Sequence, residues 1–143
     1  MIVVDASLAT KLVVDEADSD AADRWFRDCD DALAAPDLIA IEVAQAVVRR
    51  VNDRQTHIET GRAALNRWHD LLAGGGIQLS HADPADVLTA AEIAMRLGHP
   101  VKDCVYLAMA IARNVDLITC DSKFAAKARA VYPGVKLWPS DGR

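Results

Sequence analysis

The sequence lacks the features that mark several special classes of protein. Its three cysteines are odd in number and include no CxxC pair, so no disulfide framework is indicated and reduced thiols are expected. No segment reaches the roughly 18 apolar residues of a membrane span. The opening MIVVDASLA has no basic leader and contains Asp5, which does not fit a signal peptide. We therefore expect a cytoplasmic protein.

An excess of basic residues is also missing. The formal net charge is −5, whereas a protein that holds nucleic acid by a basic surface is normally positive. This argues against a plain electrostatic binder, but not against a nuclease whose extra carboxylates hold metal. The sequence has no GxSxG motif or phosphate-cradling glycine loop. Its histidines lack metal-ligand spacing and are expected at the surface or in caps: His57, His69, His81 and His99.

What is present is typical of a single α/β domain. The 143 residues are 52% hydrophobic and 26% charged, a normal mix for one domain with a packed core, here residues 1–143. Apolar runs predict strands at 2–4, within 29–35, and at 77–80, 116–119 and 135–137. Because helical patterns alternate with these strands, we expect a small parallel sheet covered by helices on both faces.

Start signals and apolar spacing place three of the helices and their buried faces. Asp37 is expected to cap a helix that ends near Asn52, Thr56 to Glu59 to form a capping box, and Asp83 to cap a later helix. The expected inward positions recur at helical spacing. They are Ile41, Ala44, Val48 and Val51, with Val47 beside them, then Ile58, Leu65, Trp68 and Leu72, and finally Val87, Leu88, Ala91, Ala94 and Met95.

The stretch PVKDCVYLAMAIARNVDLITCDSKF, from 100 to 124, is the part around which the rest is organised. From 101 to 112 it is apolar on every side except at Lys102 and Asp103, which predicts a helix buried all round. A short strand follows, and Asp121 comes after it at once. Two acids thus occupy a helix start and a strand end, where open α/β sheets keep their chemistry.

Four carboxylates are candidates for that chemistry. Asp5, Asp103 and Asp121 stand where strands end or helices begin, and each has an ordinary explanation as a cap or a first-turn acid. Glu42 lies on a polar helix line with Gln45, which a solvated face explains as well as chemistry does. Jointly, the three aspartates are expected on one sheet edge, where clustered carboxylates repel one another and a cation is the usual remedy.

The neighbours of these acids narrow the choice of metal. Oxygen ligands with few histidines or cysteines nearby select Mg²⁺ or Mn²⁺, as one or two ions. Ser7 and Thr119 could orient metal-bound water, although helix-start and strand roles explain each hydroxyl singly. Cys104 and Cys120 each adjoin a candidate acid, but neighbours in a helix or strand point elsewhere, so core packing is expected for both.

Three blocks of the sequence resemble a known family. IVVDASLATKLVVDE, at 2–16, resembles the first strand, acid and helix of a PIN domain. PDLIAIEVAQAVVRR, at 36–50, resembles the second block and carries over Glu42. DCVYLAMAIARNVDLITCD, at 103–121, resembles the third and fourth blocks and carries over Asp103 and Asp121. The chain is similar in particular to the VapC-type toxin ribonucleases of bacterial toxin–antitoxin pairs.

This resemblance implies a fold, a cofactor and partners. The expected fold is a three-layer α/β/α PIN-like domain with a five-stranded parallel sheet. The family implies an acidic pocket with Mg²⁺ or Mn²⁺, a homodimer, and a co-expressed VapB-like antitoxin that blocks the pocket. Ser122 follows Asp121 where some relatives have a further polar or acidic ligand, which leaves open whether one metal or two is bound.

The predicted function is therefore a metal-dependent endoribonuclease, which hydrolyses RNA phosphodiester bonds with a metal-activated water. The expected catalytic and metal-binding residues are Asp5, Glu42, Asp103 and Asp121. Weaker candidates for contacts with RNA phosphates are Arg49, Lys102 and Lys123.

Two alternatives stay open. The first is a catalytically silent PIN-fold module that binds a partner or RNA, although such a surface would do better without four acids. The second, a phosphate-signalling receiver domain, needs a phospho-accepting aspartate after a middle strand and a lysine after a late one. Ser80-His81 and Thr119-Cys120-Asp121 supply neither.

Overall fold

The computed structural model describes residues 1–140, and within them five strands alternate with seven helices. The strands are β1 (Ile2–Val4), β2 (Leu33–Pro36), β3 (Gln78–Ser80), β4 (Leu117–Thr119) and β5 (Val135–Leu137). The helices are α1 (Ala6–Lys11), α2 (Ser19–Asp28), α3 (Ile39–Asn52), α4 (Ile58–Ala73), α5 (Pro84–Leu97), α6 (Val101–Arg113) and α7 (Ser122–Ala128). Every strand and helix expected from the sequence is present.

The strands form one parallel sheet in the order β3-β2-β1-β4-β5. The central strand β1 pairs with β2, where Ile2 lies opposite Leu33, and with β4, where Val3 lies opposite Leu117. Because all pairings are parallel, the carboxyl ends of the strands meet at one edge of the sheet. Asp5 follows β1 and Asp121 follows β4 at this edge, as predicted.

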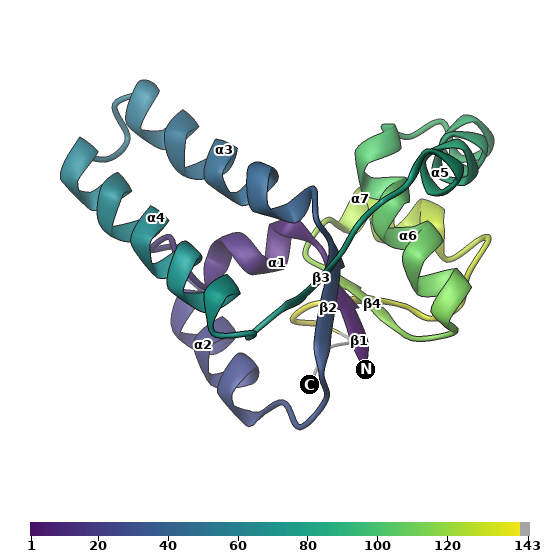
Figure 1. Ribbon diagram of the computed structural model, residues 1–143, viewed down its shortest axis with the longest axis horizontal. Coiled ribbons are helices and arrows are strands. Elements are labelled where there is room, and N and C mark those ends of the chain that lie inside the picture. Colours follow the sequence, from purple (N-terminus) through teal and green to yellow (C-terminus); the bar gives the residue numbers. More distant parts are fainter. Residues whose placement is uncertain (141–143) are drawn as a thin grey trace.

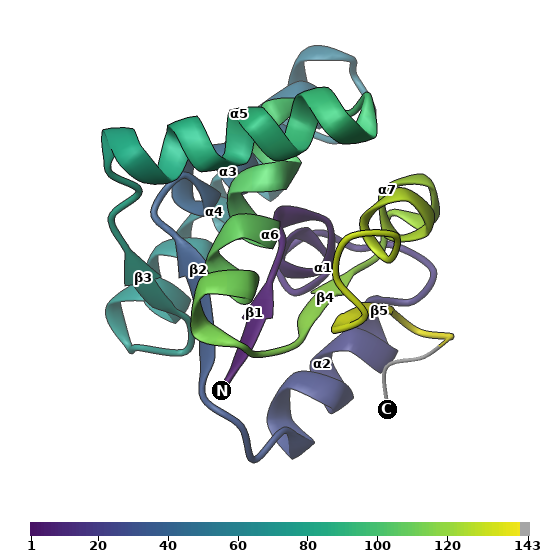
Figure 2. The same ribbon diagram turned by 90° about the vertical axis from the view of Figure 1, so that its right-hand side faces the viewer.

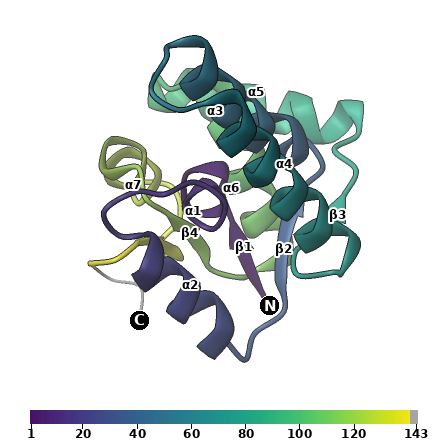
Figure 3. The same ribbon diagram turned by 90° about the vertical axis from the view of Figure 1, so that its left-hand side faces the viewer.

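Helices cover both faces of the sheet (Figure 1). Helices α1 to α4 lie on one side, and α6 lies against the other side with α5 packed across it (Figures 1 and 2). Helices α3 and α4 form a pair that extends away from the sheet, whereas α2 lies at the opposite end of the molecule (Figure 3). This confirms the three-layer α/β/α fold that the resemblance implied.

Helix α6 supplies much of the core but is not buried all round. Cys104, Tyr106 and Leu107 are almost fully buried, whereas Val101 is 41% and Ile111 38% exposed. A 13-residue helix is about 20 Å long, and the three-residue strands beside it are about 10 Å long. The ends of α6 therefore extend beyond the sheet, and the prediction of complete burial was wrong at those ends.

The buried face of α3 differs from the predicted one. Ile39, Val43 and Val47 are buried, whereas Ile41 is 73% and Val48 45% exposed. The face is set by α4, which approaches α3 closely at Gly61, where an added Cβ would lie 2.6 Å from a Val51 methyl carbon. The predicted stripe was therefore wrong at Ile41 and Val48, because the position of α4 selects the face that carries Val47.

Helix α5 shows the same kind of error. Ala90 and Ala94 are buried, whereas Val87, Leu88 and Met95 are 43%, 69% and 71% exposed, against the prediction that they face inward. Small residues let α5 lie close to α6, so the larger apolar side chains are left on the outer face. In α4, Trp68 is buried as expected, but Ile58 is 54% exposed.

Two of the three predicted caps are wrong. Leu38, not Asp37, precedes α3, and the Asp37 carboxylate instead accepts the Ala82 amide at 3.3 Å. Helix α4 begins after His57 without a side-chain cap, so the capping box at Thr56 is absent. The third cap is confirmed, because Asp83 and Asp86 form a reciprocal capping box at the start of α5.

Within residues 1–140 the structure has neither a disulfide bond nor a helix suited to span a membrane. All three thiols are unpaired. Cys104 is buried, whereas Cys29 and Cys120 are half-buried, so the expectation of core packing holds fully for Cys104 only. No helix in this range is both long and apolar enough to cross a membrane.

Candidate functional site

Asp5 lies at the junction of β1 and α1, and its carboxylate is buried. It caps α1 by accepting the amides of Ser7 at 3.0 Å and Leu8 at 3.2 Å, so its ordinary role as a cap is confirmed. Burial raises the pKa of Asp5 from 3.8 to about 6, against the lowering effect of hydrogen bonds from Ser7, Thr119 and Leu8. The nearby charge of Asp103 raises it further.

Two hydroxyl groups connect the Asp5 junction to the end of β4. The Ser7 hydroxyl donates to Asp5 Oδ1 at 2.5 Å and accepts the Cys120 amide at 2.8 Å. The Thr119 hydroxyl oxygen lies 3.4 Å from that of Ser7 and accepts the Asp121 amide at 3.0 Å. These contacts fix the relative positions of the segments that carry Asp5 and Asp121.

Glu42 reaches the same region from the first turn of α3. Its side chain is only 12% exposed, so it does not belong to a solvated helix face. The buried Tyr106 hydroxyl donates to one carboxylate oxygen of Glu42, and the Lys102 amine lies 3.2 Å from the other. Residues of α6 therefore hold this carboxylate in place.

Asp103 and Asp121 lie together with a histidine at the start of α6. Ligand atoms of His99, Asp103 and Asp121 all lie within 4.8 Å of one another, a spacing that fits a shared metal ion. His99 Nε2 is 2.7 Å from Asp103 Oδ2, and the imidazole ring stacks on Phe124 with centroids 4.8 Å apart. Asp121 also caps α7 by accepting the Phe124 amide at 2.9 Å.

The structure brings the four predicted acids to one end of the sheet. Burial, the hydrogen bond to Glu42, and the charges of Glu42, Asp5 and Asp103 all raise the pKa of Tyr106, so three of the acids lie near this side chain. Asp103 is also a member of the group with Asp121. Asp103 thus lies near both Asp5, whose pKa its charge raises, and Asp121.

Positive charge at this site is scarce among residues 1–140. The basic side chains within ion-pair distance of the four acids are Lys102, on Glu42, and His99, on Asp103. The buried Asp5 has neither. A buried carboxylate with so little compensation, as at Asp5, favours the neutral form. A divalent cation with oxygen ligands is the partner that this donor set fits.

His99 and Tyr106 are the site residues that the sequence analysis missed. The expectation that His99 lies at the surface or in a cap was wrong, because its side chain is only 10% exposed. The available signal was spacing: His99 precedes Asp103 by four residues and Tyr106 follows it by three. Asp103 and Tyr106, three residues apart, share a face of α6, whereas His99 precedes this helix. The sequence alone did not show which face of the helix meets Glu42.

The predicted basic residues occupy different places. Lys102 contacts Glu42, and Lys123 lies exposed in the first turn of α7. Arg49 lies with Ser7 and Cys120 around a cavity of about 400 Å³ that adjoins the acids. Lys11 and Arg50 also line this cavity, and both pair with Glu16.

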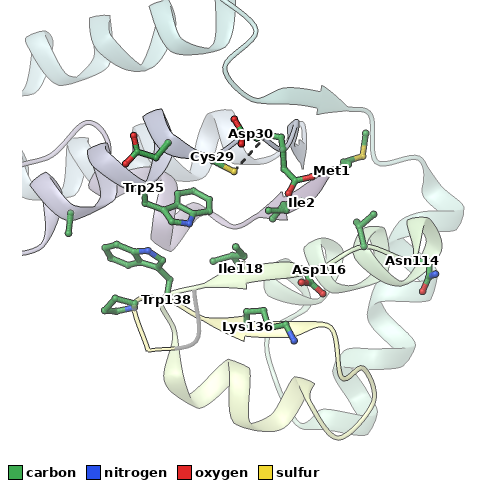
Figure 4. A pocket seen from close by; sticks show the side chains of 15 residues that line it. Met1, Ile2, Trp25, Cys29, Asp30, Asn114, Asp116, Ile118, Lys136 and Trp138 are labelled. Carbon is green, nitrogen blue, oxygen red and sulfur yellow. Dashed lines mark hydrogen bonds and ion pairs between the residues drawn. The ribbon is translucent and has the colours of Figure 1, made fainter. Parts of the chain in front are cut away.

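A larger cavity, of about 840 Å³, lies away from the acids at the opposite edge of the sheet. Trp25 and Trp138 line it, and Ile118 and Lys136 border it from β4 and β5 (Figure 4). None of the four candidate acids lines this cavity. This larger cavity is therefore separate from the acidic site.

Comparisons with known proteins agree with this architecture. The model of the PIN domain family matches residues 2–130. No curated protein matches the sequence. Solved structures with a similar fold include PAE2754 from Pyrobaculum aerophilum, with 21% identity and a TM-score of 0.68 over 88% of this chain and 83% of that one.

Two further structures come from toxin systems. Mycobacterium tuberculosis VapC20, described as a toxin that cleaves the sarcin-ricin loop, shares 18% identity with a TM-score of 0.69, over 88% of this chain and 94% of that one. A toxin–antitoxin complex from Klebsiella pneumoniae shares 16% identity with a TM-score of 0.61, over 95% of this chain and 96% of that one. At these identities the likeness concerns the fold.

Proposed function

The chain belongs to the PIN domain family, and we propose that it is a metal-dependent endoribonuclease, the VapC-type toxin of a toxin–antitoxin pair. One observation carries the proposal: acids from four separate segments converge at the carboxyl edge of the sheet, with Asp103 near both Asp5 and Asp121. The similarity in fold to VapC20 and to a toxin–antitoxin complex supports the choice of RNA as substrate.

The proposed cofactor is Mg²⁺ or Mn²⁺, held by Asp5, Glu42, Asp103 and Asp121. A bound divalent cation supplies a water of lowered pKa and positive charge at the scissile phosphate. The buried carboxylate of Asp5 and the spacing of Asp103 and Asp121 support this assignment.

The residues around the acids prepare the site. The Ser7 hydroxyl and two backbone amides direct the Asp5 carboxylate, and the Tyr106 hydroxyl fixes one oxygen of Glu42. Such preorganisation avoids rearrangement when charge develops on the substrate. None of these side chains needs to act as a covalent nucleophile in a phosphodiester hydrolysis of this type.

The substrate and partners follow from the surroundings of the site. We propose that Arg49, in the cavity next to Ser7, and Lys123, in the first turn of α7, contact RNA phosphates beside the acids. Lys102, the third residue predicted to contact RNA phosphates, also forms an ion pair with Glu42. We further propose a VapB-like antitoxin, a homodimer and a cytoplasmic location. The exposed Leu88 and Met95 on α5 are available for protein contacts.

The test is RNA cleavage by purified protein with Mn²⁺, with and without a chelator. Asp103→Asn should abolish metal-dependent cleavage while the far-ultraviolet circular dichroism stays unchanged. The matched control is Asp116→Asn, an exposed aspartate at the opposite edge of the sheet, which should cleave normally. Full activity in Asp103→Asn, or cleavage that the chelator does not affect, would contradict the proposal. Absence of cleavage by the wild type would contradict it as well and favour the catalytically silent module.

A further inference from the structure

His99 is placed unlike the other histidines of the chain. It lies between α5 and α6, and its side chain is 10% exposed, compared with 79% for His69 and 78% for His81. The imidazole is held between the Phe124 ring, whose plane is inclined by 25°, and the carboxylate of Asp103. A ring fixed in this way has little freedom to turn from the acidic site.

The position of the imidazole nitrogen fits a metal ligand. Donors bound to one cation at about 2.1 Å lie about 3 Å apart when adjacent and about 4.2 Å apart when opposite. His99 Nε2 is 2.7 Å from Asp103 Oδ2. One ring nitrogen of His99 and one carboxylate oxygen each of Asp103 and Asp121 lie within 4.8 Å of one another. These separations need only small side-chain adjustments to place all three donors around one ion.

We propose that His99 is a ligand of the cation at this site and that its nitrogen makes the site prefer Mn²⁺ to Mg²⁺. The inference rests on the proposed metal-dependent function and adds a nitrogen donor to the expected carboxylates. Imidazole suits later first-row metals, whereas Mg²⁺ favours an all-oxygen shell. A site of carboxylates alone would lack this source of discrimination.

The alternative role for His99 is to position Asp103 through their hydrogen bond. Two substitutions separate the roles. His99→Gln keeps an amide donor that can reach Asp103 but removes the imidazole nitrogen. His99→Phe keeps a ring to stack on Phe124 but removes both functions. His81→Gln is the matched control, because His81 also contacts an aspartate, with Nδ1 2.9 Å from Asp37 Oδ2, outside the acidic site.

The experiment measures Mn²⁺ and Mg²⁺ affinity by calorimetry and, on the Mn²⁺-loaded full chain, the electron spin echo modulation from a directly bound ¹⁴N. The wild type and His81→Gln should show the nitrogen modulation and bind Mn²⁺ more tightly than Mg²⁺. Both His99 variants should lose the modulation and bind Mn²⁺ at least about tenfold more weakly, with Mg²⁺ affinity changed less than about threefold.

The outcomes distinguish this inference from the function on which it rests. The role of His99 would be overturned if the wild type binds Mn²⁺ without nitrogen modulation, or if His99→Gln retains the preference for Mn²⁺ over Mg²⁺. Either result would leave the acidic metal site intact. Absence of any Mn²⁺ or Mg²⁺ binding by the wild type would overturn both. Circular dichroism melting of each variant shows whether a loss of affinity reflects a loss of fold.

Discussion

The two edges of the sheet each carry four carboxylates in very different settings. At the carboxyl edge are Asp5, Glu42, Asp103 and Asp121, of which Asp5 is buried and the others half-buried. At the opposite edge, around the larger cavity lined by Trp25 and Trp138, are four exposed aspartates: Asp28, Asp30, Asp31 and Asp116. The second group borders the larger cavity, and Asp31 there pairs with the N-terminal amine at 2.8 Å.

The difference shows that burial, and not the number of acids, marks the candidate site. In water, two unit charges 4 Å apart interact by only about 1 kcal/mol, so exposed aspartates tolerate one another without a cation. A buried carboxylate has lost that solvation and favours protonation unless a positive charge replaces it. At the carboxyl edge, this loss of solvation raises the pKa of Asp5. We therefore expect the two groups to respond differently to pH, metal and mutation.

The largest expected difference is the pH dependence of stability without metal. The folded state holds the Asp5 proton up to about pH 6, whereas the unfolded chain releases it near 3.8. Between these values the folded state binds more protons, so the contribution of Asp5 to stability falls as pH rises. The pKa difference corresponds to about 3 kcal/mol.

Asp5→Asn keeps an oxygen that can cap α1 and should remove this loss. In urea unfolding with a chelator, the variant should gain on the wild type as pH rises from about 4 to about 6, by up to about 3 kcal/mol. If the stabilities of the two proteins change in parallel across this range, the ionisation of Asp5 does not lower the stability of the folded state as expected.

The next effect is the stabilisation of the folded state by metal. A ligand that binds only the folded state at 100 times its dissociation constant adds about 2.7 kcal/mol, which for a chain of this size raises the melting temperature by roughly 5–10 °C. Mn²⁺ should produce this rise in the wild type and not in Asp103→Asn/Asp121→Asn.

The control for metal stabilisation takes two acids from the opposite edge. Asp30→Asn/Asp116→Asn makes the same change in net charge at exposed positions and should keep the full rise with Mn²⁺. A rise that is lost equally in both double variants would mean that the cation responds to overall charge and not to the acidic site.

The smallest expected difference concerns two tyrosine hydroxyls. Tyr106 donates to Glu42 at the carboxyl edge, and Tyr132 donates to the Val115 carbonyl at 2.9 Å near the other edge. Hydrogen bonds to charged acceptors contribute about 1.5–3 kcal/mol and neutral ones about 1. In urea unfolding, Tyr106→Phe should therefore lose more stability than Tyr132→Phe, and the reverse order would weaken the role assigned to Tyr106.

Prediction from sequence succeeded where one local signal decides the structure. Asp5 and Asp121 are helix caps because a short apolar run precedes each and a helix follows, and parallel pairing then places both at the same edge. Prediction failed where the outcome depends on a second element. Asp37 looks like a cap in sequence, but its carboxylate binds the Ala82 amide after β3. His99 precedes Asp103 by four residues in the sequence, but only the structure shows that Phe124 and Asp103 hold its ring in the site.

The order of strands and helices, the parallel sheet and the edge where the acids gather follow from the sequence, because apolar period, caps and right-handed crossovers are local or nearly local rules. Tertiary packing decided three other features. They are the choice of buried side chains on α3 and α5, the hydrogen bond from Tyr106 to Glu42, and the presence of an imidazole among the carboxylates. Those features depend on the distance and rotation between elements, which residue spacing along one helix does not specify.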